Sequence, residues 1–254
     1  MSTKKEHKFP TEVIDLPSKG LVYPEDSPLS SGQITIKYMT AKEEDILASQ
    51  NLIKKGVVLD KLFESIIIDD IDINDIIIGD KNAILIATRI LGYGNEYNAE
   101  VTDPFSLERQ NVTIDLSQVK VKEVDESVLN RENRYKFTLE KTQKDIEFKL
   151  LTHGDELEIN KDLQALARLT KNAGSKEVTT RLRHMIVSVD GKEERKTINE
   201  LAENLVSQDS KALRNYVNSI SPDLELKFQF ESDITGEMEA LDIPFGIDFF
   251  YPSE

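Results

Sequence analysis

The first forty residues place apolar side chains between residues that break helices. Prolines and glycines interrupt this stretch repeatedly, and a proline removes a backbone donor and restricts the residue before it, so no helix is expected. The alternating residues Gln33 to Tyr38 predict a short strand. We therefore expect residues 1–39 to form an extended arm with a short strand, packed on its own domain or on a neighbouring subunit. A chain lacking residues up to Ser31 is expected to fold still.

Helical periodicity follows the arm. Thr40 and Glu43 have the spacing of a capping box, which opens a helix. Asp80 is placed to cap another helix at its N-terminus. Three helices are predicted in this section, over residues 40–56, 58–67 and 81–91.

Strand patterns and helical patterns then alternate along the chain. Apolar residues alternate with polar ones at Tyr135, Phe137 and Leu139 and again at Ile146, Phe148 and Leu150, which predicts a hairpin. The predicted fold class is α+β, an N-terminal extended arm followed by helical sections that alternate with antiparallel β-hairpins. After residues 1–39 the expected sections are a helical section 40–96, a β-hairpin section 97–152, a helical section 153–222 and a C-terminal β-hairpin with an aromatic tail, 223–254.

Two predicted hairpins have similar patterns. Residues 98–116 and residues 228–245 each read as a strand, a polar tip and a return strand. The likeness has two explanations that the pattern leaves open, an internal repeat or two unrelated hairpins of ordinary build.

Charge and composition narrow the possible functions. The 254 residues include 32 Lys and Arg against 47 Asp and Glu, a formal net charge of −15, which disfavours nucleic acid and anionic membranes as partners. The absence of cysteine excludes disulfides, thiol nucleophiles and cysteine-based metal sites. No run of about 20 apolar residues and no secretory signal is visible, so we expect a cytoplasmic chain. The three histidines are scattered and no phosphate-binding loop is present, so no metal or cofactor is expected.

One segment opposes the overall charge. Residues 161–196 carry nine basic and five acidic residues. This segment is either a docking face for an acidic protein surface or an ordinary solvated helical face, and we favour the second over a nucleic-acid site because aromatic residues are not interleaved with the basic ones.

The strongest catalytic candidate is a histidine beside two carboxylates. His153, Asp155 and Glu156 could support general acid–base chemistry in a hydrolase. They also occur where a strand should end and a helix begin, so Asp155 could simply be an N-cap. We favour the capping role, and expect no enzyme.

Apolar residues near both ends are candidate partner contacts. The residues that we select are Leu16, Leu21, Tyr23, Phe245, Phe249, Phe250 and Tyr251. Chain ends are usually polar and frayed unless something holds them. The aromatic tail is therefore either a buried last strand or an anchor for a partner, in which aromatic residues are enriched.

Several long motifs resemble the baseplate hub protein family of T4-like bacteriophages. They are LPSKGLVYPEDSPLSSGQITIKYMTAKEEDIL (16–47), NLIKKG (51–56), GDKNAILIATRILGYG (79–94), FKLLTHGDE (148–156) and IPFGIDFFYP (243–252). The resemblance implies a non-catalytic protein that helps to build the central hub of the contractile-tail baseplate through protein–protein contacts. It leaves open whether the chain stays in the virion or is a hub-assembly chaperone, and whether it forms a homo-oligomer.

The resemblance also bears on the two similar hairpins. Related chains often carry paired cysteines near these tips, in the manner of small zinc ribbons. This chain has VTDPFSLERQ and FESDITGEME instead. The resemblance thus implies two degenerate ribbons without metal, whose turns we expect apolar packing to hold.

Overall fold

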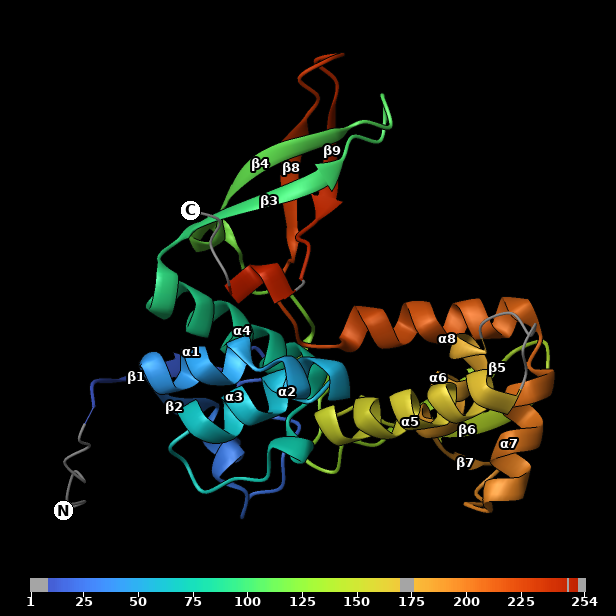
Figure 1. Ribbon diagram of the computed structural model, residues 1–254. Coiled ribbons are helices and arrows are strands. Elements are labelled where there is room, and N and C mark those ends of the chain that lie inside the picture. The colour runs from blue at the N-terminus through green and yellow to red at the C-terminus, as the bar shows by residue number, and fades with distance from the viewer. Residues whose placement is uncertain (1–8, 170–175, 246, 251–254) are drawn as a thin grey trace.

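The computed structural model describes residues 9–169, 176–245 and 247–250 (Figure 1). The helices are α1 Ala41–Ala48, α2 Gln50–Lys55, α3 Val58–Ile66, α4 Ile78–Tyr93, α5 His153–Leu169, α6 Glu177–Met185, α7 Arg195–Asn204 and α8 Ser207–Ile220. The strands are β1 Thr11–Asp15, β2 Gln33–Lys37, β3 Glu96–Thr102, β4 Arg109–Asp115, β5 Tyr135–Leu139, β6 Lys144–Phe148, β7 Ile186–Val189, β8 Lys227–Glu231 and β9 Met238–Asp242.

The elements form three parts. A body contains β1, β2 and α1–α4, and a lobe beside it contains β5–β7 and α5–α8 (Figure 1). Two hairpins, β3–β4 and β8–β9, project from the body on the same side (Figure 1). All sheets are small and antiparallel, which confirms the predicted α+β class.

The predicted arm is folded into the body. Strand β1 pairs with β2, so the segment contains a hairpin in addition to the predicted strand. The loop between them buries Leu16, Val22, Tyr23 and Leu29 in the core. Of the two expected packing modes, the structure shows packing on the chain's own body. Since that deletion removes part of the core, we now expect a chain without residues up to Ser31 not to fold.

Glycine is required where this loop crosses itself. Gly20 has a φ of 76°, a conformation that other residues rarely adopt. A Cβ atom there would lie 2.4 Å from the carbonyl oxygen of Ser30. The chain can thus return on itself closely enough to place Tyr23 over α4.

The helices of the body follow the predicted pattern with shifted ends. Glu43 accepts hydrogen bonds from the backbone N–H (2.8 Å) and hydroxyl (2.7 Å) of Thr40, which confirms the capping box. The helix expected to reach Gly56 is broken at Ser49 into α1 and α2. Helix α4 begins at Ile78, so Asp80 is not its N-cap but a buried residue of its first turn.

The lobe contains a strand in a section that was predicted to be helical. β5 and β6 pair as predicted, with Tyr135 opposite Phe148. β7 then adds a third strand beside β6, inside the section expected to be helical. Its four residues show no clear alternation of apolar and polar side chains. Pairing with β6 and burial, which the local sequence pattern does not reveal, determine that this segment is a strand.

One apolar core joins the body and the lobe. Buried residues of both parts, such as Ile84 of α4 and Leu213 of α8, belong to the same cluster. Backbone hydrogen bonds also cross between them, from Ile78 to Leu151 (3.2 Å) and from His153 to Ile76 (2.8 Å). A Cβ atom on Gly79 would lie 1.9 Å from the Pro222 carbonyl oxygen, so a glycine is needed where the chain after α8 crosses α4.

Candidate protein-interaction sites

The tip of the β3–β4 hairpin is a tight hydrogen-bonded turn. The Asp103 N–H donates to the Glu108 carbonyl (2.8 Å), and the Leu107 N–H donates to the Asp103 carbonyl (2.8 Å). The Asp103 carboxylate accepts from the N–H groups of Phe105 (2.8 Å) and Ser106 (3.3 Å). Leu107 has a φ of 62°, which is uncommon for a residue other than glycine.

The tip of the β8–β9 hairpin repeats this pattern position by position. The Ser232 N–H donates to the Glu237 carbonyl (2.9 Å), and the Gly236 N–H donates to the Ser232 carbonyl (2.9 Å). The Ser232 hydroxyl accepts from the N–H groups of Ile234 (3.3 Å) and Thr235 (3.0 Å). Gly236 has a φ of 70°, as its counterpart does in the other tip. This equivalence favours an internal repeat over two unrelated hairpins.

The two tips are also bonded to each other. We refer to them together as the paired tips (residues 103–108 and 232–237). The Ser232 hydroxyl donates to the Asp103 carboxylate (2.5 Å). The Gln110 side chain donates to the Glu231 carbonyl (2.9 Å) and accepts from the Asp233 N–H (3.0 Å). Although the hairpins belong to separate sheets, they are joined into one unit.

Polar contacts hold these turns, where we expected apolar packing. Asp103 and Ser106 are three positions apart, as are Ser232 and Thr235, the spacing of paired cysteines in a zinc ribbon. The pKa of Asp103 lies below its usual value. Burial by itself would raise this pKa, but the hydrogen bonds to the carboxylate, above all the one from Ser232, lower it by more. Among the described residues, no group of three or more His, Cys, Asp or Glu side chains could hold a metal.

The exposed side chains of these tips are not among the residues predicted as partner contacts. Phe105 is 37% exposed, Leu107 77% and Ile234 60%, and Met238, the first residue of β9 directly after the second tip, is 64% exposed. A turn at a hairpin tip is ordinarily built from polar residues and glycine. Large apolar residues between two predicted strands were therefore the signal that could have identified this surface.

The residues predicted as partner contacts occupy different environments. Those buried inside the chain are Leu16, Tyr23, Phe249 and Phe250. Leu21 is half-buried, whereas Phe245 is 40% exposed. Tyr251 lies outside the described residues. The buried side chains pack within this chain, so among the described aromatic-tail residues Phe245 is the one whose exposure suits a partner contact.

A buried carboxylate holds the loop between β1 and β2 on α4. Asp80 accepts hydrogen bonds from the N–H (2.9 Å) and hydroxyl (2.6 Å) of Ser18 and from the hydroxyl of Tyr23 (2.6 Å). The Ile77 N–H donates to the Tyr23 oxygen (3.1 Å). Burial, followed by the charge of Asp80, raises the pKa of Tyr23. Ser18 and Tyr23, in the motif 16–47, and Asp80, in the motif 79–94, therefore have a structural role.

A buried arginine holds the aromatic tail in the same way. Arg89 of α4 donates from Nε to the Phe249 carbonyl (2.7 Å), and from its two Nη atoms to the carbonyls of Gly94 and Glu96 (2.9 Å each). Its guanidinium lies 5.9 Å from the centre of the Tyr97 ring. The segment Ile247–Phe250 is thereby fixed against α4 and β3.

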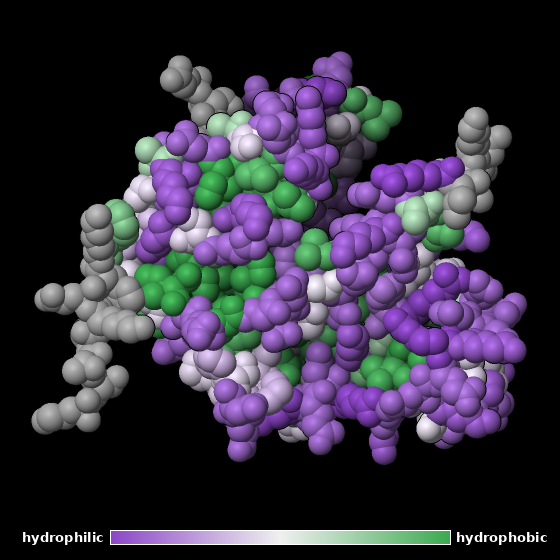
Figure 2. Space-filling model, turned by 60° about the horizontal axis from the view of Figure 1, so that its bottom comes forward, coloured by the Kyte–Doolittle hydropathy of each residue, from purple (hydrophilic) through white to green (hydrophobic). Residues whose placement is uncertain are grey.

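An apolar pocket of about 310 Å³ opens beside this tail. It is lined by Leu47, Val58, Leu59, Leu85, Phe245, Phe249 and Phe250. The rings of Phe245 and Phe249 are 5.1 Å apart between centres. The face of the molecule in Figure 2 is mainly hydrophilic, and its larger apolar patches lie on the side of the body. Because all of its lining side chains are apolar, the pocket is a second candidate contact surface.

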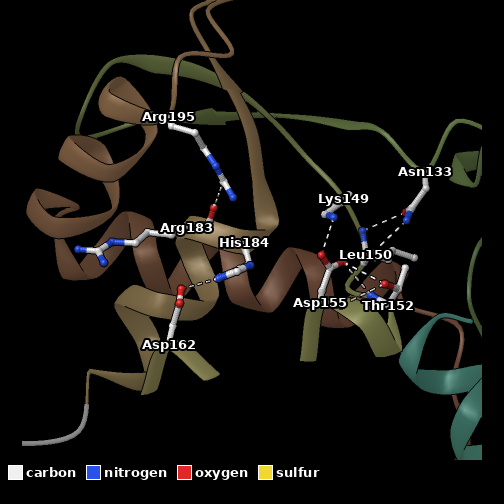
Figure 3. A network of polar contacts seen from close by, with 9 residues as sticks. All are labelled: Asn133, Lys149, Leu150, Thr152, Asp155, Asp162, Arg183, His184 and Arg195. Atoms are coloured by element: carbon white, nitrogen blue, oxygen red, sulfur yellow. Dashed lines mark hydrogen bonds and ion pairs between the residues drawn. The ribbon is translucent and has the colours of Figure 1, made fainter. Parts of the chain in front are cut away.

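The predicted catalytic side chains do not converge. Asp155 is the third residue of α5; its carboxylate accepts from the Thr152 N–H (3.0 Å), and its own N–H donates to the Thr152 hydroxyl (3.3 Å). It also accepts from Lys149 (2.7 Å), as Figure 3 shows. Asp155 thus completes a capping box with Thr152 and is not itself the N-cap.

His153 and Glu156 are engaged elsewhere. The buried His153 lies between Lys81, whose Nζ is 2.9 Å from Nδ1, and Asp60, whose Oδ1 is 2.9 Å from Nε2. Glu156 pairs with Arg181 of α6 (2.5 Å). Burial lowers the pKa of Lys81, and the nearby carboxylates of Asp60 and Glu156 counter this in part. These contacts join α3, α4, α5 and α6, and the arrangement that the hydrolase hypothesis requires is not formed.

Many cations of the basic segment 161–196 are paired within the chain. The pairs are Lys161–Glu158, Arg181–Glu156, Arg183–Glu203 and Lys196–Glu200. His184, in the same segment, lies 3.0 Å from a carboxylate oxygen of Asp162. Arg195 donates to the Arg183 carbonyl (2.9 Å), beside the pair of His184 and Asp162 in Figure 3. Lys171 lies outside the described residues. Docking of an acidic partner on this segment remains a prediction.

Comparison with known protein families agrees with the resemblance. A family model described as T4 bacteriophage base plate protein matches residues 21–250. The chain therefore belongs to this family and is a structural protein of the bacteriophage tail baseplate, where it interacts with other baseplate proteins. No curated protein and no solved structure matches it. Within the described residues, no helix is long and apolar enough to cross a membrane.

Proposed function

We propose that this chain is a non-catalytic structural and assembly protein of the central baseplate hub, acting through protein–protein contacts while the contractile tail is built. The observation that carries the proposal is the family match over residues 21–250. Exposed apolar side chains on the paired tips and Phe245 beside its pocket give the chain surfaces suited to such contacts.

The polar clusters support a structural role. Asp80, Arg89 and His153 are buried, and each connects elements that are distant in sequence. Hydrogen bonds satisfy the side chains of Asp80 and Arg89, and buried polar groups satisfied in this way fix a particular packing. The titratable groups of the described chain that most resemble a catalytic centre thus hold the body, the lobe and the tail together.

The test is a phage in which the gene for this chain carries an early stop codon. We expect infected cells to accumulate tails without a complete hub, as seen by electron microscopy, and a plasmid copy to restore them. Normal baseplates without the chain would overturn the proposal. The proposal includes assembly in the host cytoplasm. Extracts of infected cells, prepared before the phage lyses its host, should contain the chain bound to hub intermediates.

Quantitative mass spectrometry of purified virions separates the two forms of this function. Stoichiometric amounts identify a hub subunit retained in the particle. If the chain is required for assembly but absent from virions, it is a non-virion chaperone for the hub. The same measurement gives its copy number, which bears on the predicted homo-oligomer.

A further inference from the structure

We propose that the paired tips are the docking site for a protein partner that presents an apolar pocket within a basic surface. This inference rests on the proposed function and names the surface and the partner chemistry that would serve it. The first observation is exposure: Phe105, Leu107 and Ile234 of the paired tips are exposed, and so is Met238, which follows the second tip as the first residue of β9. Single exposed apolar residues are ordinary, but a group of them at one place marks an interaction site.

The second observation is charge. Residues 96–115 and residues 227–242 each contain five acidic residues and one basic residue, a formal net charge of −8 for the two hairpins together. Arg109 pairs with Glu100 (2.7 Å) and Lys227 lies 3.9 Å from Asp242, so both cations are already neutralised within their own hairpins. About half of the chain's charge of −15 is therefore carried by these two hairpins.

Acidic residues surround the apolar ones at the tips. Glu108 follows Leu107 directly, and Asp233 precedes Ile234 in the other turn, and both carboxylates are exposed. A partner that buries the apolar side chains brings its own rim against these carboxylates. Basic residues at that rim would complement the charge, accelerate encounter and exclude acidic surfaces.

The third observation is that the surface is held in shape before binding. Ser232 bonds to Asp103, and Gln110 bonds to the backbone of Glu231 and Asp233, so the two turns cannot separate without breaking these bonds. The hairpins stand away from the body, where a partner can enclose them (Figure 1). Because a preformed surface loses little conformational freedom on binding, a small contact area can be effective.

The same charge argues against the other occupants. A second copy bound tip to tip would bring two groups of −8 together, and nucleic acid would be repelled likewise. The basic segment 161–196 of a second copy is a poor complement, since Arg181 and Arg183 are already paired inside their own chain. A different protein with a basic surface is the occupant that remains.

The experiment uses the full chain, immobilised, with each baseplate protein of the same phage purified singly as the probe. Binding is measured by interferometry for the wild type, for the tip variant L107N/I234S and for the matched control V178S/V206S. Asn is chosen at position 107 because it tolerates positive φ. Val178 and Val206 are exposed valines of the lobe, 45% and 46% exposed.

We expect one probe to bind the wild type and the control equally and the tip variant at least tenfold more weakly. A charge variant, E108Q/D233N/E237Q, should chiefly slow association, and raising the salt concentration should do the same to the wild type. Circular dichroism and melting temperature verify that each variant is folded. Equal affinity of wild type and tip variant, binding only to another copy, or binding by no probe would each overturn the inference.

Assembly experiments in phage distinguish failure of the proposed function from failure of the docking site. If phage without the chain builds normal baseplates, the proposed function itself fails. If the chain is required but L107N/I234S supports assembly as well as the wild type, only the docking site at the paired tips is refuted.

Discussion

The hydroxyl of Tyr23 donates a hydrogen bond of 2.6 Å to the buried carboxylate of Asp80, across 57 positions of sequence. The same oxygen accepts the N–H of Ile77, just before α4 begins. One side chain of the N-terminal loop thus satisfies two buried polar groups of the body. This relationship explains why a proline- and glycine-rich segment is part of the folded core.

Replacing Tyr23 by Phe should therefore lower the free energy of unfolding. The change leaves the Ile77 N–H without its partner and removes one of the donors to Asp80. Leaving a buried polar group unsatisfied costs about 1–3 kcal/mol, so we expect a loss of about 2–4 kcal/mol. Urea denaturation followed by circular dichroism measures it.

Tyr38→Phe is the matched control. Tyr38 is half-buried, and its hydroxyl makes no hydrogen bond with the described part of the chain. We expect its removal to change stability by less than about 0.5 kcal/mol. Equal effects of the two substitutions would show that the bond to Asp80 contributes nothing specific.

Truncation to residue 31 should prevent folding. The deletion removes β1 and the buried side chains of Leu16, Val22, Tyr23 and Leu29. Removing a large buried side chain costs about 2–5 kcal/mol, so the four together cost about 8–20 kcal/mol, as much as the roughly 5–15 kcal/mol by which a whole domain is stable. Loss of the cooperative thermal transition is the expected result. A deletion of residues 1–8 is the control, since it keeps every described contact.

Glu43 should make stability depend on pH in acid. Burial would raise the pKa of Glu43, but hydrogen bonds from Lys37, Ser65 and Thr40 outweigh it and lower the pKa to about 2. The unfolded pKa is about 4.3. A carboxyl whose pKa is depressed by folding stabilises the fold fully above its unfolded pKa, and this contribution is lost as the pH falls towards its folded pKa.

Comparison of the wild type with E43Q tests this sign. At pH 7 we expect E43Q to be less stable by about 2–4 kcal/mol, because one partner of a buried ionic network is lost. The difference should shrink between about pH 5 and pH 2. E44Q, at an exposed neighbouring position, should show neither effect. A gap between wild type and E43Q that stays constant over this range would contradict the assignment.

The bond between Asp103 and Ser232 should couple the two hairpins energetically. A double-mutant cycle with D103A, S232A and the double variant isolates their interaction. We expect a coupling free energy of about 1–2 kcal/mol, since the acceptor is a carboxylate. Thermal denaturation of the four proteins supplies the values. A cycle with D103A and T113A is the control, and additivity in both cycles would mean that the hairpins behave independently.

Local pattern was enough for much of the secondary structure. The capping box of Thr40 and Glu43 depends on residues three positions apart, and the β5–β6 hairpin depends on alternation over a short stretch. β7 was missed because its pairing with β6 determines it, and the break at Ser49 was missed because the helical pattern continues across this residue. In the same way, Asp80 and Asp155 have sequence contexts typical of an N-cap, but Asp80 bonds to a distant loop and Asp155 lies three residues after Thr152, with which it forms the capping box.

By itself the sequence determined the α+β class, the baseplate family, the acidic charge and the absence of cysteine, because these depend on composition, periodicity and long motifs. Only the tertiary structure decided which apolar residues are available to a partner. Leu16 and Phe249 were predicted as partner contacts because they are apolar residues near the chain ends, but both are buried. Leu107 and Ile234 lie in polar stretches of sequence and are exposed. Exposure depends on what the rest of the chain covers, and that is a property of packing between segments distant in sequence.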